Sequence, residues 1–226
     1  AYGTPWAGWV LERSKRESLW SLLIGREVAK AEPPAVDSAL LPTTGLAVLK
    51  IGQAPTFWQG AGRSATLFVG PHGDFHGHPG KLGLEFRRDG EYLVQDSGIG
   101  SGYAFAMHRR WFSTTLAHST VVIDGRNQHF TRCGDRPEND LAETGRLHAH
   151  LFGARVQAAV GSADFAYPGH ECRRILFLAD DYLLDVFSCR SRDGLPHTYD
   201  WICHTDGLIR ADLPFAPGCL GYTEDG

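Results

Sequence analysis

The fold is decided by Cys172-Arg-Arg-Ile-Leu-Phe-Leu-Ala-Asp-Asp-Tyr-Leu-Leu-Asp-Val-Phe-Ser-Cys189, in which two apolar runs flank a turn signal. The runs Cys172–Leu178 and Tyr182–Cys189 are short and rich in branched and aromatic residues, a composition typical of β-strands. Ala179-Asp-Asp181 favours a turn between them, because aspartate side chains bond readily to nearby backbone groups. The stretch therefore predicts two strands joined by a turn.

The same pattern recurs along the chain from Gly45 onward. Turn signals such as Arg88-Asp-Gly90 and Asp124-Gly125 separate many of the apolar runs, and no convincing helix lies between them. Many short strands with turns between them predict an antiparallel sandwich or barrel rather than parallel βαβ units. The further strand candidates are Leu46–Ile51, Ala65–Val69, Leu82–Arg87, Tyr92–Gln95, Ser119–Asp124, Arg146–Phe152, Arg155–Val160 and Thr198–His204.

A helical pattern precedes the strands. Trp9–Ala31 alternates leucines with charged residues at roughly helical spacing, and Glu32-Pro-Pro-Ala35 ends it because proline lacks the backbone N–H. We expect residues 1–44 to hold this helix and a linker, and residues 45–226 to hold the β domain. The chain lacks an initiator Met and an obvious closing element, so we expect a fragment of a longer protein, truncated at the C-terminus.

Composition excludes some classes of function. The formal net charge of −4 gives no support for nucleic-acid binding, and no apolar run approaches the roughly 20 residues of a membrane helix. The five cysteines are widely spaced without a CxxC motif, which argues against a cysteine zinc site. Cys172, Cys189 and Cys203 lie in strand-like runs, and we expect buried free thiols there.

A histidine-rich turn is the clearest candidate site. Gly70-Pro-His-Gly-Asp-Phe-His-Gly-His-Pro-Gly-Lys-Leu82 contains His72, His76 and His78, and residues two apart in a strand share a face. Asp96 and His118 each lie at the edge of a predicted strand. Two histidines and a carboxylate are a common ligand set for zinc, although polar residues at strand ends are also ordinary hydrogen-bonding groups.

Three stretches together resemble the heparinase II/III-like polysaccharide lyases: Gly70–Leu82, Gln95-Asp-Ser-Gly98 and Ala117-His-Ser-Thr-Val-Val-Ile-Asp-Gly-Arg-Asn-Gln128. The resemblance implies an N-terminal (α/α) helical toroid followed by a large antiparallel β-sandwich. Trp20-Ser-Leu-Leu-Ile-Gly25 resembles the last toroid helix. His197-Thr-Tyr-Asp-Trp-Ile-Cys-His204 resembles a later stretch of the family.

The resemblance also implies roles for individual residues. His78, Asp96 and His118 match the family's zinc ligands, and His76 and Tyr103 match catalytic residues that cleave a uronate glycosidic bond by β-elimination. Lys81, Arg109 and Arg110 are candidates to bind uronate carboxylates. The chain departs from the family at Gly80, where an aspartate is common, and at Ser119, where an asparagine is common.

Several alternatives stay open. The chain is interpreted either as part of a lyase, or as a non-catalytic carbohydrate-binding sandwich, or as a metal-dependent glycan hydrolase. His197, Asp200 and His204 suggest either a second metal site or a hydrogen-bonded network. The expected partners are an acidic polysaccharide such as alginate or a glycosaminoglycan, the toroid of the same enzyme, and a second copy in a homo-oligomer. A periplasmic or secreted bacterial protein is expected, with the cytoplasm as the alternative.

Overall fold

A computed structural model provides the structure of the chain. The expected helix at Trp9–Ala31 lies outside the described residues apart from Trp9, as do His72, His76 and Tyr103. The residues that the structure describes are 32–70, 77–98, 106–129, 145–206 and 208–212, together with positions 9, 214 and 218.

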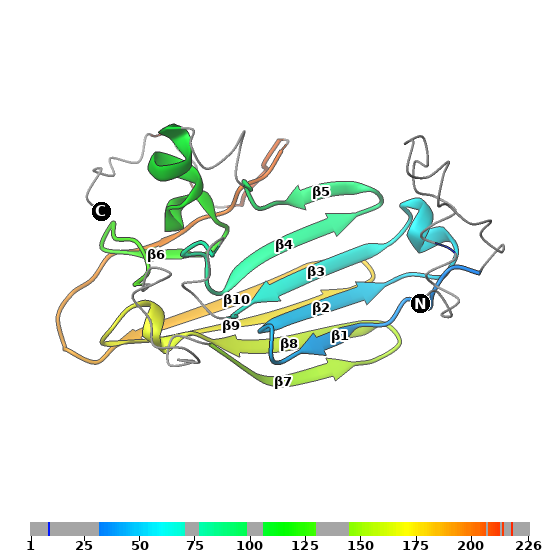
Figure 1. Ribbon diagram of the computed structural model, residues 1–226, viewed down its shortest axis with the longest axis horizontal. Coiled ribbons are helices and arrows are strands. Elements are labelled where there is room, and N and C mark those ends of the chain that lie inside the picture. Colours follow the sequence, from blue (N-terminus) through cyan, green and yellow to red (C-terminus); the bar gives the residue numbers. More distant parts are fainter. Residues whose placement is uncertain are drawn as a thin grey trace, which may run out of the picture.

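Five antiparallel strands form the first sheet, in the order β1-β2-β3-β4-β5 (Figure 1). Every second residue of β2 is buried, as expected for a strand with one face toward a core. The short strand β1 lies within the segment expected as a linker, where it pairs with β2. The strands are β1 (Ala39–Leu41), β2 (Leu46–Ile51), β3 (Arg63–Phe68), β4 (Gly83–Arg88) and β5 (Glu91–Val94).

Four antiparallel strands form the second sheet, in the order β10-β9-β8-β7. The predicted hairpin is confirmed, because β9 and β10 pair along their length with Cys172 opposite Cys189 and Leu178 opposite Leu183. The strands are β7 (Arg146–Phe152), β8 (Val156–Ser162), β9 (His170–Ala179) and β10 (Leu183–Ser191).

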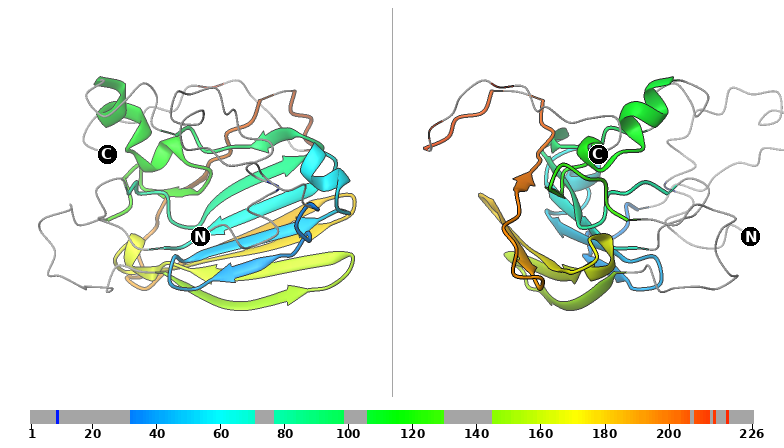
Figure 2. Two further views of the ribbon diagram at one scale, coloured as in Figure 1. Left: turned by 45° about the vertical axis from the view of Figure 1, so that its right-hand side comes forward. Right: turned by 90° about the vertical axis from the view of Figure 1, so that its left-hand side faces the viewer.

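The two sheets pack face to face, as Figure 2 shows from two sides. Leu49 and Leu67 of the first sheet share one buried core with Leu176 and Leu178 of the second. Burial of these alternating apolar residues is the main force that holds the layers together. The sheets thus form the predicted antiparallel sandwich rather than a barrel. Within the described residues, no helix is long and apolar enough to cross a membrane.

A small two-stranded sheet and four short helical turns complete the described fold. The small sheet pairs β6 (Val121–Ile123) with β11 (Tyr199–Trp201), which joins segments far apart in sequence. The turns are η1 (Thr56–Gln59), η2 (His108–Phe112), η3 (Thr115–Ala117) and η4 (Asp164–Ala166).

One buried guanidinium links these layers. Arg174 of β9 is fully buried, and its Nη1 donates to the carbonyl oxygens of Leu82 at 2.5 Å and Ser119 at 2.7 Å. Its Nε and Nη2 donate to the two carboxylate oxygens of Asp185 on β10, at 2.7 and 2.6 Å. Asp185 also accepts a hydrogen bond from Trp201 Nε1 of β11 at 3.1 Å. The network therefore joins the second sheet, the small sheet and the segment that leads into β4.

We expect Arg174→Met to destabilise the protein by about 3–5 kcal/mol, because it leaves the Asp185 carboxylate without its cation and two carbonyls without their donor. Denaturant unfolding measures the change. The matched control is Arg173→Met, which alters an exposed neighbour on the same strand and should change stability by less than about 0.5 kcal/mol. Equal effects of the two substitutions would contradict the proposed role of Arg174.

Candidate functional site

Three predicted site residues come together from separate segments. His78 lies in the loop before β4, Asp96 follows β5, and His118 lies between η3 and β6. Nδ1 of His118 is 2.5 Å from Oδ2 of Asp96, and the other carboxylate oxygen accepts the N–H of Gly98 at 2.8 Å. The imidazole centroids of His78 and His118 are 5.4 Å apart. The structure therefore places two imidazoles and a carboxylate in one group.

Hydrogen bonds hold the loop after His78 in place. The hydroxyl of Thr115 donates to the carbonyl oxygen of Pro79 at 2.8 Å. Gln128 makes two bonds to the backbone of Lys81: Oε1 accepts its N–H at 2.6 Å and Nε2 donates to its carbonyl at 2.9 Å. The hydroxyl of Thr120 donates to the same carbonyl at 2.7 Å. These bonds tie the loop that follows one imidazole to the segment that carries the other.

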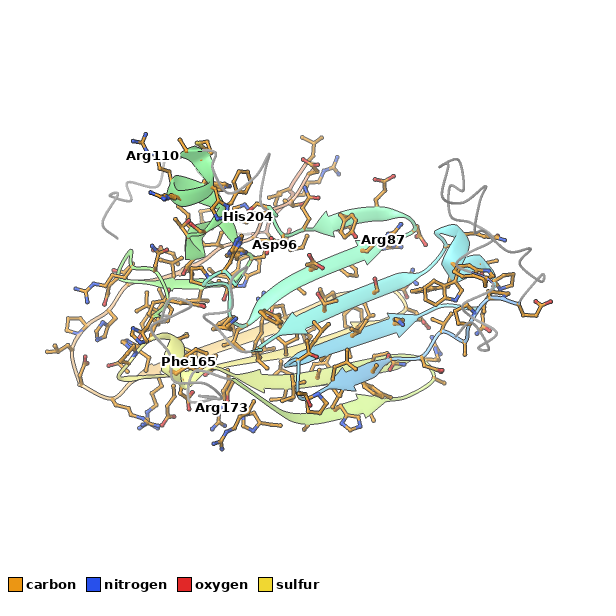
Figure 3. The ribbon with its side chains drawn as sticks, viewed as in Figure 1. Arg87, Asp96, Arg110, Phe165, Arg173 and His204 are labelled. Carbon is orange, nitrogen blue, oxygen red and sulfur yellow. The ribbon has the colours of Figure 1, made fainter. Side chains whose placement is uncertain are left out.

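His204 fastens two other segments of the site. Its Nε2 donates to the carbonyl oxygen of Leu116 at 2.8 Å, and its backbone N–H donates to the hydroxyl of Ser119 at 3.1 Å. The His204 carbonyl accepts the N–H of Gln95 at 3.2 Å. Figure 3 shows His204 beside Asp96, below η2. His204 thus bridges the segments that carry the site carboxylate and the second imidazole.

His197 lies in a different network from His204. Its Nδ1 is 2.6 Å from a carboxylate oxygen of Asp124, and its Nε2 is 3.0 Å from Asp193. The hydrogen bond to Asp124, followed by that to Asp193, raises the pKa of His197 above its ordinary value. Both ring nitrogens of His197 therefore already face carboxylates, which favours the hydrogen-bonded network over a second metal site.

The surroundings shift the pKa values of two site residues. Partial burial alone would raise the pKa of Asp96, but the hydrogen bond and charge of His118, together with the N–H of Gly98, hold it below its usual value. Burial, followed by the nearby charge of His118, lowers the pKa of His78. The site therefore favours an ionised carboxylate and a neutral imidazole at His78, which are the protonation states of metal ligands.

The nitrogen and oxygen atoms of the site are of the types that coordinate a cation. Nε2 of His78 and Nε2 of His118 are buried and have no hydrogen-bond partner among the described residues. A buried ring nitrogen without a partner is costly, and an ion or a water satisfies it. As the side chains lie, however, the described part of the chain contains no group of three or more His, Cys, Asp or Glu arranged to hold a metal ion. The carboxylate of Asp96 is instead joined to His118.

Gly80 allows the His118 ring to lie against the backbone. A Cβ at position 80 would be only 2.7 Å from Cγ of His118 and 2.9 Å from its Cδ2. Contacts this short do not occur between real side chains, so the ring or the loop would have to shift. A side chain larger than glycine at position 80 is therefore incompatible with the His118 ring where it lies.

The three basic candidates have different environments. Lys81 is fully buried, with Nζ 4.3 Å from the centroid of the Phe68 ring. Arg109 and Arg110 are exposed on η2. Figure 3 shows Arg110 at the outer end of this turn. The burial of Lys81 favours a structural role, and contact of any of the three with substrate stays a prediction.

Sequence reasoning missed two contributors to this region. His108 of η2 places its ring 5.4 Å from that of His78, although no motif pointed to it. Arg174 had a signal: its alternation with Cys172 and Leu176 places it on the buried face of β9. His76 and Tyr103 lie outside the described residues, and their roles stay predictions.

The fold and the site together define the class of this protein. It is an antiparallel β-sandwich in which imidazoles and a carboxylate are grouped beside one sheet. Residues 33–211 match the family described as heparinase II/III-like, C-terminal. The chain therefore belongs to the heparinase II/III-like family, as the sequence motifs predicted.

A relative by sequence agrees with this membership, and two solved structures have a similar fold. An alginate lyase of Stenotrophomonas maltophilia (strain K279a) is 32% identical over 155 residues, which cover 62% of this chain and 18% of that protein. The heparan sulfate lyase HepC of Pedobacter heparinus has a similar fold, with a TM-score of 0.57 at 18% identity, over 82% of this chain and 27% of that one. A heparinase III gives a TM-score of 0.57 at 21% identity, over 81% and 26%. The chain thus spans about a quarter or less of these proteins.

We expect Gly80→Ala to move the His118 ring away from Asp96 and to destabilise the protein by about 1–3 kcal/mol, because a Cβ overpacks the site. Denaturant unfolding and the NMR resonances of the imidazole report the two effects. Gly218→Ala is the control, since a Cβ there meets no atom of the described residues within 4 Å. An alanine at position 80 that left both the stability and the imidazole resonances unchanged would contradict the packing described.

Proposed function

We propose that the full-length protein is a polysaccharide lyase that cleaves a uronate glycosidic bond by β-elimination. Membership of the heparinase II/III-like family, with an alginate lyase 32% identical over 155 residues, is the observation that carries the proposal. The grouping of His78, Asp96 and His118 supports it, because the sequence resemblance implies that these residues belong to the family's site. In this reaction a base removes the C5 proton, the C4–O bond breaks, and the leaving oxygen gains a proton.

Alginate is the substrate that we propose first. The relative named for it matches by sequence, whereas the heparan sulfate lyase and heparinase III are below 25% identity and support the fold alone. Alginate and heparan sulfate both contain uronate units, so both fit the elimination chemistry. Heparan sulfate differs by its sulfate groups, so a direct comparison of the rates on the two polymers distinguishes between them as substrates.

We propose His76 and Tyr103 for the two proton transfers. A neutral imidazole accepts a proton near neutral pH, and a phenol close to it donates or accepts one when its pKa is tuned. His76 is two residues from His78 in sequence. The remaining catalytic groups are proposed to come from the toroid of the same protein.

Arg109 and Arg110 are the residues that we propose to neutralise the uronate carboxylate. Removal of the C5 proton becomes easier when the adjacent carboxylate is paired with a cation, and a guanidinium matches a carboxylate in two-point fashion. Both arginines are exposed and lie on the same turn as His108, whose ring is near that of His78.

We also propose that His78, Asp96 and His118 hold one zinc ion. The two buried Nε2 atoms and the ionised carboxylate are ligand types that zinc accepts. When bound, the ion would supply positive charge to the site. The Gln128, Thr115 and His204 hydrogen bonds described above hold the backbone segments next to these side chains. A periplasmic or secreted location is proposed as well, because such polymers lie outside the cytoplasm.

The lyase proposal predicts ultraviolet absorbance from a new C4–C5 double bond when the full-length protein is given alginate, and less with heparan sulfate. We expect His76→Ala to lower kcat by about 10²–10⁴-fold, the usual contribution of a proton-transfer group. His150→Ala, which changes an exposed histidine of β7, is the control and should keep the full rate. Saturated products would indicate a hydrolase, and glycan binding without any product would indicate a binding module.

The zinc proposal predicts about one zinc per chain in full-length protein purified without added metal. Elemental analysis of wild type, His118→Ala and His150→Ala measures it. His118→Ala should lose the ion because it removes a buried ligand, whereas His150→Ala should keep it. A folded, fully active wild-type protein that contained no metal would rule the zinc out.

A further inference from the structure

Two thiols face each other across the hairpin that dominates the second sheet. Cys172 of β9 and Cys189 of β10 are directly paired in register, and their Sγ atoms are 3.5 Å apart. Both are free cysteines, and neither belongs to the candidate site. The cysteines are therefore close enough to react with each other after only a small movement.

The hydrogen-bond pattern shows which kind of pair they form. The N–H of Cys172 donates to Oδ1 of Asp164 at 3.1 Å, and its carbonyl accepts the N–H of Ala163 at 3.1 Å. Both backbone groups of Cys172 thus point away from β10, so Cys172 and Cys189 form a non-hydrogen-bonded pair. The Cα atoms of such a pair are about 4.5 Å apart, within the range that a disulfide spans.

We propose that Cys172 and Cys189 form a disulfide when the protein meets a thiol–disulfide oxidant, such as an oxidised small-molecule or protein dithiol. The proposal goes beyond the lyase function, and does not require it. It concerns Cys172 and Cys189 because, among the described cysteines, these two face each other in register.

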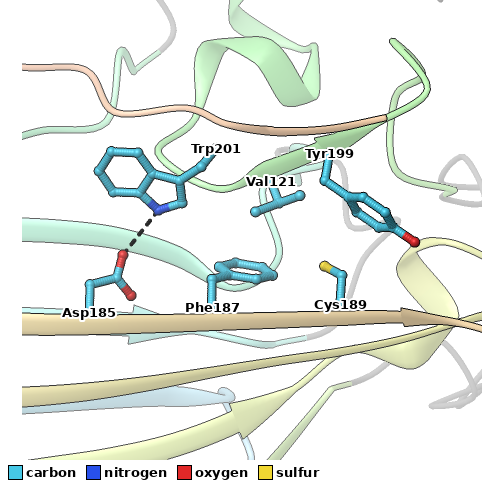
Figure 4. Close-up of a pocket in the computed structure, with 6 residues that line it drawn as sticks. All are labelled: Val121, Asp185, Phe187, Cys189, Tyr199 and Trp201. Carbon is cyan, nitrogen blue, oxygen red and sulfur yellow. Dashed lines mark hydrogen bonds between the residues drawn. The ribbon is translucent and has the colours of Figure 1, made fainter. Parts of the chain in front are cut away.

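Cys189 is the sulfur that the oxidant reaches first. It lines an open hollow together with Phe187, Tyr199 and Trp201, whereas Cys172 is 3% exposed. Figure 4 shows Cys189 projecting from β10 into this hollow. The hydrogen bond from the Cys172 thiol also lowers the pKa of Cys189, which favours the reactive thiolate.

The chemistry is a balanced exchange in two steps. The Cys189 thiolate attacks one sulfur of the oxidant's disulfide, which gives a mixed disulfide and releases one thiol. Cys172 then loses its proton, attacks Sγ of Cys189, and displaces the second thiol. Two S–H bonds are lost and one S–S bond forms, and the two electrons and two protons leave on the reduced oxidant.

The bond would cross-link the strands that carry the Arg174–Asp185 ion pair. Arg174 follows Cys172 by two residues on the buried face of β9, and Asp185 faces it from β10. A cross-link there limits the separation of the two strands in the unfolded chain and so stabilises the folded one.

The test is mass spectrometry of the full-length protein after equilibration with oxidised glutathione. We expect a loss of two hydrogens per chain and a single linked peptide pair that contains Cys172 and Cys189. The oxidised protein should melt about 5 °C higher than the same sample after reduction. Cys203→Ala is the control variant and should form the same linked pair, whereas Cys189→Ala should not.

Two results would overturn the proposal. One is that Cys172 and Cys189 both remain alkylatable at full stoichiometry after oxidation of folded wild-type protein. The other is that either cysteine is linked to a different partner. Both results are measured on the wild-type protein, so they test the proposal even if a cysteine variant fails to fold.

Discussion

The buried guanidinium of Arg174 is the interaction that fixes the small sheet and the segments of the candidate site against the second sheet. A charge with no exposure is stable only when its donors are satisfied, and here one carboxylate and two carbonyl oxygens satisfy them. The carbonyls belong to Leu82, which follows the loop of His78, and to Ser119, which directly follows His118. A side chain of the second sheet therefore sets the distance between the loop of His78 and the loop of His118.

The strands followed closely from sequence, because alternation of buried and exposed residues is a local property. The prediction for Leu46–Ile51 agrees with β2 at both ends, and that for Arg146–Phe152 agrees with β7. The strand β1 was not predicted. Its three residues lie between prolines, and only pairing with β2 makes them a strand. Because β1 forms only through pairing with β2, its own sequence shows no alternation from which it could be predicted.

The site was predictable in its residue types but not in its connections. Motif order pointed to His78, Asp96 and His118, which the structure places together. The ring of His108 and the bridging bonds of His204 could not be read from sequence, because each depends on segments brought together by the fold. Lys81 shows the opposite error: a lysine in a polar motif suggests the surface, but Lys81 is fully buried and its ammonium lies over the ring of Phe68.

The short contact between Asp96 and His118 has a consequence for the chemistry open to that ring. Because the ionised carboxylate accepts a hydrogen bond from Nδ1, this nitrogen carries the proton of the neutral imidazole. The lone pair of the ring is then on Nε2, the buried nitrogen that has no hydrogen-bond partner among the described residues. A carboxylate on one side of the ring therefore decides which nitrogen is basic and can receive an incoming proton or cation.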